Sequence, residues 1–322
     1  MEKKLKYYIK KFQNLKQGVT KYGPAPHKPI LLLSLLQAYR NELFTNNFIT
    51  ITPELVSLFN SNWNALVDTK NVSNFSLPFF HLSREKFWHL KANPGYETAL
   101  NTIESISSLG QINTFIQSAS LDVDLFHLFK DNESNSILSE VLLLKYFPGN
   151  KNNLTLLIQK GYKHYEDLKD KILHEQSGQY IAEIERLIEL KNEDEIFIRS
   201  NIFKREIPIL YGNTCSVSRL RITSTIEVSM IDACHIHRWS ESHDDTRNNG
   251  IALCPNLHRA FDRGLISIDD NYRLLISSAF NESSSNYNIN QYKFKEILLP
   301  KEPKDYPSLE NLDWHRKNVF KR

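Results

Sequence analysis

Hydrophobic residues recur at helical spacing along much of the first half of the chain. The pattern predicts helices over four stretches, namely residues 29–40, 51–67, 120–131 and 135–148. Thr52 is the expected cap of the second helix, with Pro53 in its first turn. Residues 74–90 instead carry aromatic side chains at short spacing, which favours strands with a turn around residues 83–85. We therefore expect a mostly helical domain with a small sheet.

The second half changes from helical to mixed patterning. Residues 163–195 are rich in charge, with apolar residues at helical spacing interrupted by Gly178, and residues 196–212 predict another helix. Four short elements follow: a strand over 225–236, a helix over 254–264, a hairpin over 265–277 and a basic helix within 307–322. In the first of these helices Pro255 stands near the start and Gly264 just past the end, an asymmetry typical of short helices.

The composition is that of an ordinary globular protein. Hydrophobic residues make up 41% of the 322 residues and charged residues 24%, which provides enough apolar material for two cores. The net charge is only +3, so a nucleic-acid surface must be a local patch. The lysine-rich start lacks the apolar run of a signal peptide, no stretch approaches the length of a membrane span, and three cysteines do not suggest a disulfide framework. These features indicate a cytoplasmic protein.

Candidate chemistry gathers between residues 232 and 270. His235, Asn249 and His258 are separated by 14 and 9 residues. The expected strand ends at His235, a loop of turn-forming residues holds Asn249, and the short helix carries His258. Asp262 follows His258 at i+4, so an imidazole and a carboxylate share one helix face. The joint spacing marks this stretch as the candidate site.

This stretch resembles the ββα-metal finger of the HNH endonucleases. The resemblance is carried by Cys234-His235-Ile236 with Trp239, by Asn249-Gly250 with Leu253, and by Leu257-His258 through Ser267. It implies hydrolysis of phosphodiester bonds in double-stranded DNA with a divalent metal, Mg²⁺ or Mn²⁺. It also makes His235 the general base, His258 a metal ligand, and Asn249 the residue whose amide fixes the loop that orients the base.

The ligand set that the resemblance implies is incomplete. Asp262 is a second metal ligand or an anchor of the first. Many HNH enzymes place a metal ligand directly before the general base, where this chain has Cys234. Asp232 shares the strand face of Cys234, and His237 shares that of His235, so both Asp232 and His237 are candidates for the missing ligand.

Two further features concern the surroundings of the finger. Arg259 and Arg263 lie on another face of the short helix and are candidate phosphate contacts. Related proteins hold the finger with a structural zinc bound by two C-x-x-C pairs. Here only Cys215 and Cys254 of those four positions are cysteines, so no structural zinc is expected.

A second resemblance covers the N-terminal part of the chain. Its short motifs are similar to those of the sulfur-binding domain of McrA-type HNH restriction enzymes, which recognises phosphorothioated DNA: His27-Lys28-Pro29, Pro78-Phe79 with Leu82, Phe87-Trp88, Leu121-Asp122 with Leu125-Phe126, and Tyr146-Phe147-Pro148. The resemblance implies an apolar pocket at Pro78, with His27 and Lys28 as a charged clamp. The family favours an aromatic residue before this proline and a small residue three after it, where the chain has Leu77 and His81.

We therefore expect an α+β protein with two domains. A mostly helical reader of modified DNA would occupy residues 1–150, a helical linker 151–200, and the HNH endonuclease domain 201–322. The expected function is cleavage of modified DNA, of restriction or phage-defence type, by a homodimer, since one finger cuts one strand. Two alternatives stay open: a modified base or a partner protein triggers the nuclease, or the chain is a DNA-binding module with an inactive finger.

Overall fold

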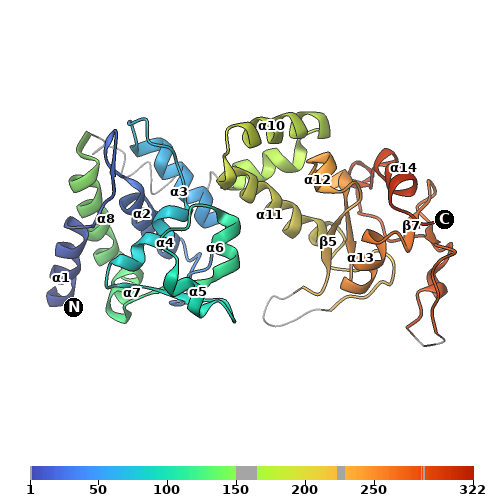
Figure 1. Ribbon diagram of the computed structural model, residues 1–322, viewed down its shortest axis with the longest axis horizontal. Helices are drawn as coiled ribbons and strands as arrows, with labels where there is room; N and C mark the ends of the chain where they lie inside the picture. The colour runs from blue at the N-terminus through green and yellow to red at the C-terminus, as the bar shows by residue number, and fades with distance from the viewer. Residues whose placement is uncertain (1, 150–164, 223–228, 284, 286) are drawn as a thin grey trace. The chain divides into compact units, whose positions relative to one another are not determined.

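The computed structural model describes residues 2–149, 165–222, 229–283, 285 and 287–322. Contacts divide them into two compact units (Figure 1). The first unit runs to Leu168 and includes Asn192–Ile198, and the second comprises Lys169–Lys191 and the chain from Arg199 onwards. Helices combine with small two-stranded antiparallel sheets, so the α+β prediction is confirmed. None of the helices that the structure describes is long and apolar enough to cross a bilayer.

The first unit is built around the helix α2 (His27–Arg40). Leucine and isoleucine occur on all sides of α2, and nearly all of its residues are buried. It contacts four other helices, namely α3 (Pro53–Leu66), α4 (Ser76–His81), α7 (Val123–Lys130) and α8 (Asn132–Tyr146). The helix α1 (Glu2–Gln13) packs on α7 and α8. As predicted, Thr52 caps α3 by accepting a hydrogen bond of 3.2 Å from the N–H of Leu55.

Two small sheets complete this unit. The strands β1 (Val19–Thr20) and β2 (Gly23–Pro24) form a hairpin immediately before α2. The strand β3 (Trp88–Ala92) pairs antiparallel with β4 (Ile116–Leu121). Two short helices lie between these strands in the sequence, α5 (Glu97–Thr102) and α6 (Leu109–Phe115). Because β4 extends to Leu121, the helix expected over residues 120–131 begins only at Val123.

The prediction of strands over residues 74–90 is wrong for its first half. That half forms α4 and a 3₁₀ turn η1 (Leu82–Arg84), and only β3 is extended. The side chain of Asn74 accepts a hydrogen bond of 3.0 Å from the N–H of Leu77, which favours a helical start. Phe75 and Phe79, four residues apart, then bury their rings on the same side of the helix.

The expected linker at 151–200 falls partly outside the described residues, as do residues 225–228 of the expected strand at 225–236. Beyond residue 164 the chain is helical over 165–174, followed by α10 (Ser177–Glu189) and α11 (Glu193–Leu210). Gly178 lies inside α10, so the helical break occurs before it, at residues 175–176. Since α10 and most of α11 belong to the second unit, the three proposed domain limits stay a prediction.

The second unit contains the finger. β5 (Asp232–His235) pairs antiparallel with β6 (Gly250–Leu253), and α13 (Pro255–Asp262) contacts both strands. Between the strands lie α12 (Trp239–Ser242) and the 3₁₀ turn η3 (Arg247–Asn249). The predicted hairpin forms from β7 (Ile266–Ile268) and β8 (Leu274–Ile276). Three further elements follow, namely the 3₁₀ turns η4 (Asn290–Tyr292) and η5 (Pro303–Asp305) and the helix α14 (Leu309–Asn318).

An apolar core holds this unit together. Its buried members include Ile231, Ile251, Leu253, Phe261 and Ile266. Side chains of α11 join the same core, so α11 is a structural part of the second unit from Arg199 onwards.

Candidate functional site

The finger brings Cys234, His258 and Asp262 together. In the sheet, Cys234 lies opposite Ile251 and is fully buried. α13 carries His258 and Asp262 one helical turn apart. One donor atom of each of the three residues lies within 4.8 Å of the others, and Sγ of Cys234 is 3.9 Å from Oδ1 of Asp262. We call these three residues the donor cluster.

His258 is held between two carboxylates. Its Nδ1 lies 3.2 Å from Oδ2 of Asp232, and its Nε2 lies 3.4 Å from Oδ2 of Asp262. An imidazole that bonds a carboxylate through one nitrogen is oriented to bind a metal through the other. This geometry favours Asp232 as the residue that orients His258, and Asp262 as a ligand. His237, the other candidate ligand, instead stacks on Trp314 with ring centroids 3.8 Å apart.

The donor cluster suits a divalent metal ion. It offers a sulfur, an imidazole nitrogen and a carboxylate oxygen within reach of one ion. HNH nucleases generally use a divalent metal, and a thiolate ligand favours softer ions such as Zn²⁺ or Co²⁺ over Mg²⁺. Burial raises the pKa of the Cys234 thiol, and the nearby Asp262 carboxylate adds to this effect. A bound cation would lower the pKa of this thiol.

His235 leaves β5 on the face opposite to Cys234, because successive side chains of a strand alternate. Its ring stacks on Phe203 of α11, with centroids 4.0 Å apart and planes 9° apart. Nε2 of His235 lies 2.8 Å from Oδ1 of Asp245. The side chain of His235 is 24% exposed, so water can reach it.

Asp245 is a functional candidate that the sequence reasoning missed. Its side chain is 1% exposed and accepts hydrogen bonds from Tyr180, Ser200 and Trp239 besides its contact with His235. The only local signal was an acidic pair, Asp244-Asp245, in the loop before Asn249. The partners on α10 and α11 come from tertiary packing, which the local pattern does not show.

Asn249 fixes the loop between the two strands. Its amide nitrogen donates to the main-chain oxygens of His237 and Asp244, both at 2.8 Å, and its side-chain oxygen accepts from the N–H of His237 at 2.7 Å. Gly250 follows, and a Cβ there would fall on the side chain of Ile207. Asn249 is therefore a structural anchor, and Gly250, the first residue of β6, allows α11 to approach. Arg259 of α13 and Arg263, which caps the C-terminus of α13, are exposed, as a phosphate contact requires.

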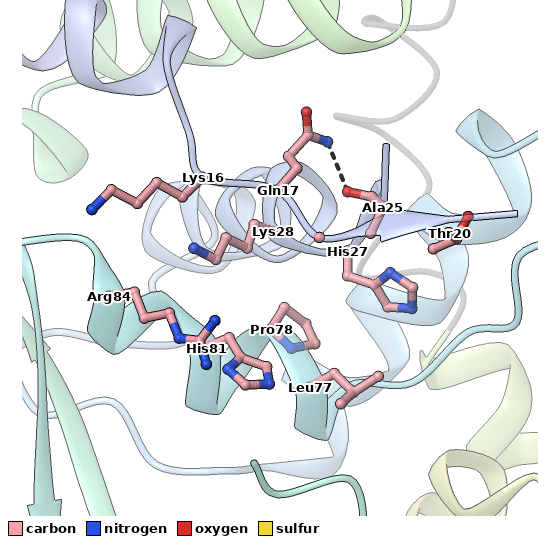
Figure 2. A pocket seen from close by; sticks show the side chains of 11 residues that line it. Lys16, Gln17, Thr20, Ala25, His27, Lys28, Leu77, Pro78, His81 and Arg84 are labelled. Atoms are coloured by element: carbon pink, nitrogen blue, oxygen red, sulfur yellow. Dashed lines mark hydrogen bonds between the residues drawn. The ribbon is translucent and has the colours of Figure 1, made fainter. Parts of the chain in front are cut away.

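The first unit carries an apolar pocket of about 330 Å³ (Figure 2). Its lining includes every residue predicted for the reader: His27, Lys28, Leu77, Pro78 and His81. Figure 2 shows His27 and Lys28 of α2 on one side and the three residues of α4 on the other. Nε2 of His81 is hydrogen-bonded to Oγ of Ser105 at 3.0 Å. Nδ1 of His81 is buried and has no hydrogen-bond partner within the described residues.

The two residues expected as a clamp have partners inside the protein. Nζ of Lys28 lies 2.7 Å from Oε1 of Glu85, and both side chains are buried. The Nε2–H of His27 donates to the main-chain oxygen of Val72 at 3.0 Å, and its ring packs 4.6 Å from that of Trp63. Burial lowers the pKa of His27, which favours the neutral form.

Two cations at this pocket were not singled out as site residues from the sequence. Lys16 and Arg84 both line it and are exposed. Neither forms a salt bridge with another of the described residues. Lys16 was one of many lysines near the N-terminus, and Arg84 lay in a predicted turn, so nothing in the sequence pattern separated them from their neighbours.

The model of the ScoMcrA-like DNA sulfur-binding domain matches residues 5–165, half of the 322 residues. The chain belongs to this family. A second model, that of the HNH endonuclease, matches residues 215–269, which contain the finger. The chain therefore joins a sulfur-binding-type domain to an HNH endonuclease domain.

Several solved structures are similar to parts of the chain. The "Modification dependent TagI restriction endonuclease" is 20% identical with a TM-score of 0.27, and the match covers 36% of this chain and 37% of that one. The "Sulfur binding domain of ScoMcrA complexed with phosphorothioated DNA" is 17% identical with a TM-score of 0.33, and the match covers 48% of this chain and 96% of that one. The "Sulfur binding domain and SRA domain of ScoMcrA complexed with phosphorothioated DNA" is 16% identical with a TM-score of 0.34, and the match covers 49% of this chain and 50% of that one. Among curated proteins no sequence match is found.

The HNH endonuclease domain retains two thiols at the positions of the C-x-x-C pairs. Cys215 and Cys254 are in hydrogen-bonding contact. This contact, with the N–H of Ser218 at 3.5 Å, lowers the pKa of Cys215, and the same contact raises the pKa of Cys254. The fourth position is Leu257, buried in the apolar core. Two cysteines do not complete a tetrahedral zinc site, which is the basis for expecting no structural zinc. This expectation stays a prediction.

Proposed function

We propose that this chain is a modification-dependent DNA endonuclease that cuts duplex DNA after its first unit has bound phosphorothioated backbone. The observation that carries the proposal is the presence, in one finger, of a metal-donor cluster and a water-accessible histidine held by a buried carboxylate. Phosphodiester hydrolysis needs a base for water and positive charge at the phosphate, and the finger offers both.

In this proposal each residue of the finger has one task. His235 takes a proton from the attacking water. Cys234, His258 and Asp262 hold a divalent metal, which when bound supplies the charge that stabilises the phosphate and the leaving oxygen. Asn249 keeps the loop of the base in place through its three hydrogen bonds. Arg259 and Arg263 contact phosphate oxygens from the exposed face of α13.

The pocket of the first unit supports the reader function. Sulfur is softer and more weakly hydrated than a phosphate oxygen, so an apolar wall formed by Leu77 and Pro78 favours it. Lys16 and Arg84 supply charge for the phosphate that carries the sulfur. His81 occupies part of the pocket where the family has a small residue, so we expect a smaller preference for sulfur than in relatives. Because one finger cuts one strand, a double-strand break requires two copies.

A cleavage assay with three duplexes tests this function. The full chain is incubated with phosphorothioated, cytosine-methylated and unmodified DNA, each with Mg²⁺, Mn²⁺, Co²⁺ or Zn²⁺. We expect cleavage of the phosphorothioated duplex. Cleavage of the methylated duplex alone would show that a modified base is the trigger. Binding without cleavage under all metals would show that the chain is a DNA-binding module.

Variants separate the two units in the same assay. His235→Ala and His258→Ala should each reduce cleavage by at least a thousandfold while leaving DNA affinity nearly unchanged. Pro78→Gly and His81→Ala should change the ratio of affinities for modified and unmodified DNA and leave the finger intact. Equal affinities that neither substitution changes would rule out the reader role of the pocket.

A further inference from the structure

The hydrogen bonds of Asp245 are divided between its two oxygens. Oδ1 contacts Nε2 of His235 at 2.8 Å. Oδ2 accepts from Oη of Tyr180 at 3.2 Å, Oγ of Ser200 at 3.0 Å and Nε1 of Trp239 at 3.0 Å. Trp239 can only donate. Burial, then the Asp245 carboxylate, raises the pKa of Tyr180, which keeps this phenol a donor.

This arrangement determines where His235 carries its proton. A carboxylate oxygen only accepts, so Nε2 of His235 must be the protonated nitrogen. Nδ1 is then the nitrogen that can accept a proton, and it has no hydrogen-bond partner within the described residues. Stacking on Phe203 restrains the plane of the ring at the same time.

We infer that Asp245 is a positioning residue that holds the proposed base His235 in its Nε2–H tautomer, with Tyr180, Ser200 and Trp239 fixing the orientation of the carboxylate. The inference rests on the proposed function, in which His235 is the base that takes a proton from water. It also gives α10 and α11 a role, since they carry Tyr180 and Ser200. These helices support the active site and do more than connect two domains.

The substitution Asp245→Asn has an outcome that a packing role does not predict. The amide must place its oxygen or its NH₂ group where Oδ2 now lies. Because Trp239 only donates, the oxygen is favoured there, and the NH₂ group then faces Nε2 of His235. That contact forces the proton onto Nδ1 and removes the base. Conversion of an orienting carboxylate to an amide reduces turnover by roughly 10⁴-fold in a well-studied histidine-dependent hydrolase.

A second substitution should reverse this effect. Trp239→Phe removes the donor-only partner, and the hydroxyls of Tyr180 and Ser200 can accept from an NH₂ group. The oxygen of the introduced amide can then face His235 again, so Trp239→Phe combined with Asp245→Asn should cleave at least tenfold faster than Asp245→Asn alone. Asp244→Asn is the matched control, because Asp244 bonds Thr246 and Ser177 and does not touch His235.

The decisive experiment measures tautomer and cleavage separately. Imidazole ¹⁵N shifts of the full chain at pH 8, with His235 assigned from the loss of its signals in His235→Gln, should show the Nε2–H form. The Nδ1–H form should appear in Asp245→Asn, and the Nε2–H form should return in the double variant. Cleavage by each variant should follow its tautomer.

Either of two results would overturn the inference: an Nδ1–H tautomer in the unsubstituted chain, or an unchanged tautomer in a folded Asp245→Asn variant. The first of these results does not depend on the folding of any variant. A chain that shows the tautomer change but cuts none of the three duplexes under any metal would overturn the proposed nuclease function and leave the tautomer assignment supported.

Discussion

Nζ of Lys28 lies 2.7 Å from Oε1 of Glu85, and each side chain is 8% exposed. Glu85 also accepts a hydrogen bond of 3.0 Å from the N–H of Lys16. Burial lowers the pKa of Lys28, and Glu85 acts against this. The charge of Lys28 is therefore neutralised inside the first unit, which is why the proposed function uses Lys16 and Arg84, and not His27 and Lys28, as the phosphate clamp.

Substitution of these three cations should separate affinity from stability. Lys16→Ala and Arg84→Ala should each weaken binding to every duplex and reduce the slope of log affinity against log salt by about one. Lys28→Ala should leave Glu85 buried without its charged partner and destabilise the first unit by about 3–5 kcal/mol. Binding titrations at several salt concentrations and thermal melts measure the two effects. A Lys28→Ala variant with an unchanged Tm and weaker binding would restore Lys28 to the clamp.

Asp194 should make the first unit less stable as the pH rises. It is 5% exposed and accepts a hydrogen bond of 3.1 Å from the N–H of Phe75, at the start of α4. Burial raises the pKa of Asp194 from 3.8 to about 7. The folded chain therefore holds the proton more tightly than the unfolded chain, and stability present below pH 4 is lost as the pH rises towards 7.

The comparison for this prediction is Asp194→Asn, which keeps an acceptor without a charge. Between pH 4 and pH 7 the unsubstituted chain should lose stability relative to the variant, by no more than roughly 4 kcal/mol. Denaturant unfolding at several pH values measures the difference. Parallel stability curves for the two chains would mean that Asp194 is ionised at low cost in the fold.

His315 should have the opposite effect in the second unit. It is 2% exposed, stacks on Phe261 at 3.7 Å and bonds Ser267 and the main-chain oxygen of Phe261. Burial lowers the pKa of His315 to about 4. The neutral form fits the fold, so stability is complete above pH 6.5 and falls by up to about 3 kcal/mol as the pH drops to 4. His315→Gln should be less stable at pH 7 but should lose less on acidification, which pH-dependent unfolding would detect.

Local patterns predicted the parts of the fold whose causes are local. Thr52 and Pro53 start α3, and Pro255 and Gly264 delimit α13, because a cap or a fixed φ acts within one turn. His235 at the end of its strand and His258 on its helix were found for the same reason. The residue types and spacing of a finger lie within about forty positions.

The remaining features depend on pairs that are distant in sequence. Lys28 and Glu85 are 57 residues apart, and Tyr180 reaches Asp245 over 65 residues. No periodicity encodes such pairs, since either partner alone looks like an ordinary charged or aromatic residue. The pairing of β3 with β4 was missed for the same reason, with two short helices between the strands.

Metal removal should affect activity far more than stability. The core of the finger is apolar, and only two of the four positions of the C-x-x-C pairs are cysteines. EDTA should therefore abolish cleavage but lower the Tm by only a few degrees, because the folded state loses only the stabilisation that the bound metal gives it. Elemental analysis of the purified chain gives an independent measure of bound zinc. Unfolding in EDTA, together with one zinc per chain that survives Cys234→Ser, would reveal a structural metal.

The identity of the active metal should depend on Cys234. Its sulfur is the soft donor of the cluster, beside the imidazole of His258 and the carboxylate of Asp262. Soft donors favour Co²⁺ and Zn²⁺, whereas carboxylates favour Mg²⁺ and Mn²⁺. Cys234→Asp should therefore raise the ratio of Mg²⁺-supported to Co²⁺-supported cleavage by about tenfold or more. Cys254→Ser, outside the donor cluster, should leave this ratio unchanged. The same ratio in Cys234→Asp as in the unsubstituted chain would show that Cys234 does not bind the metal.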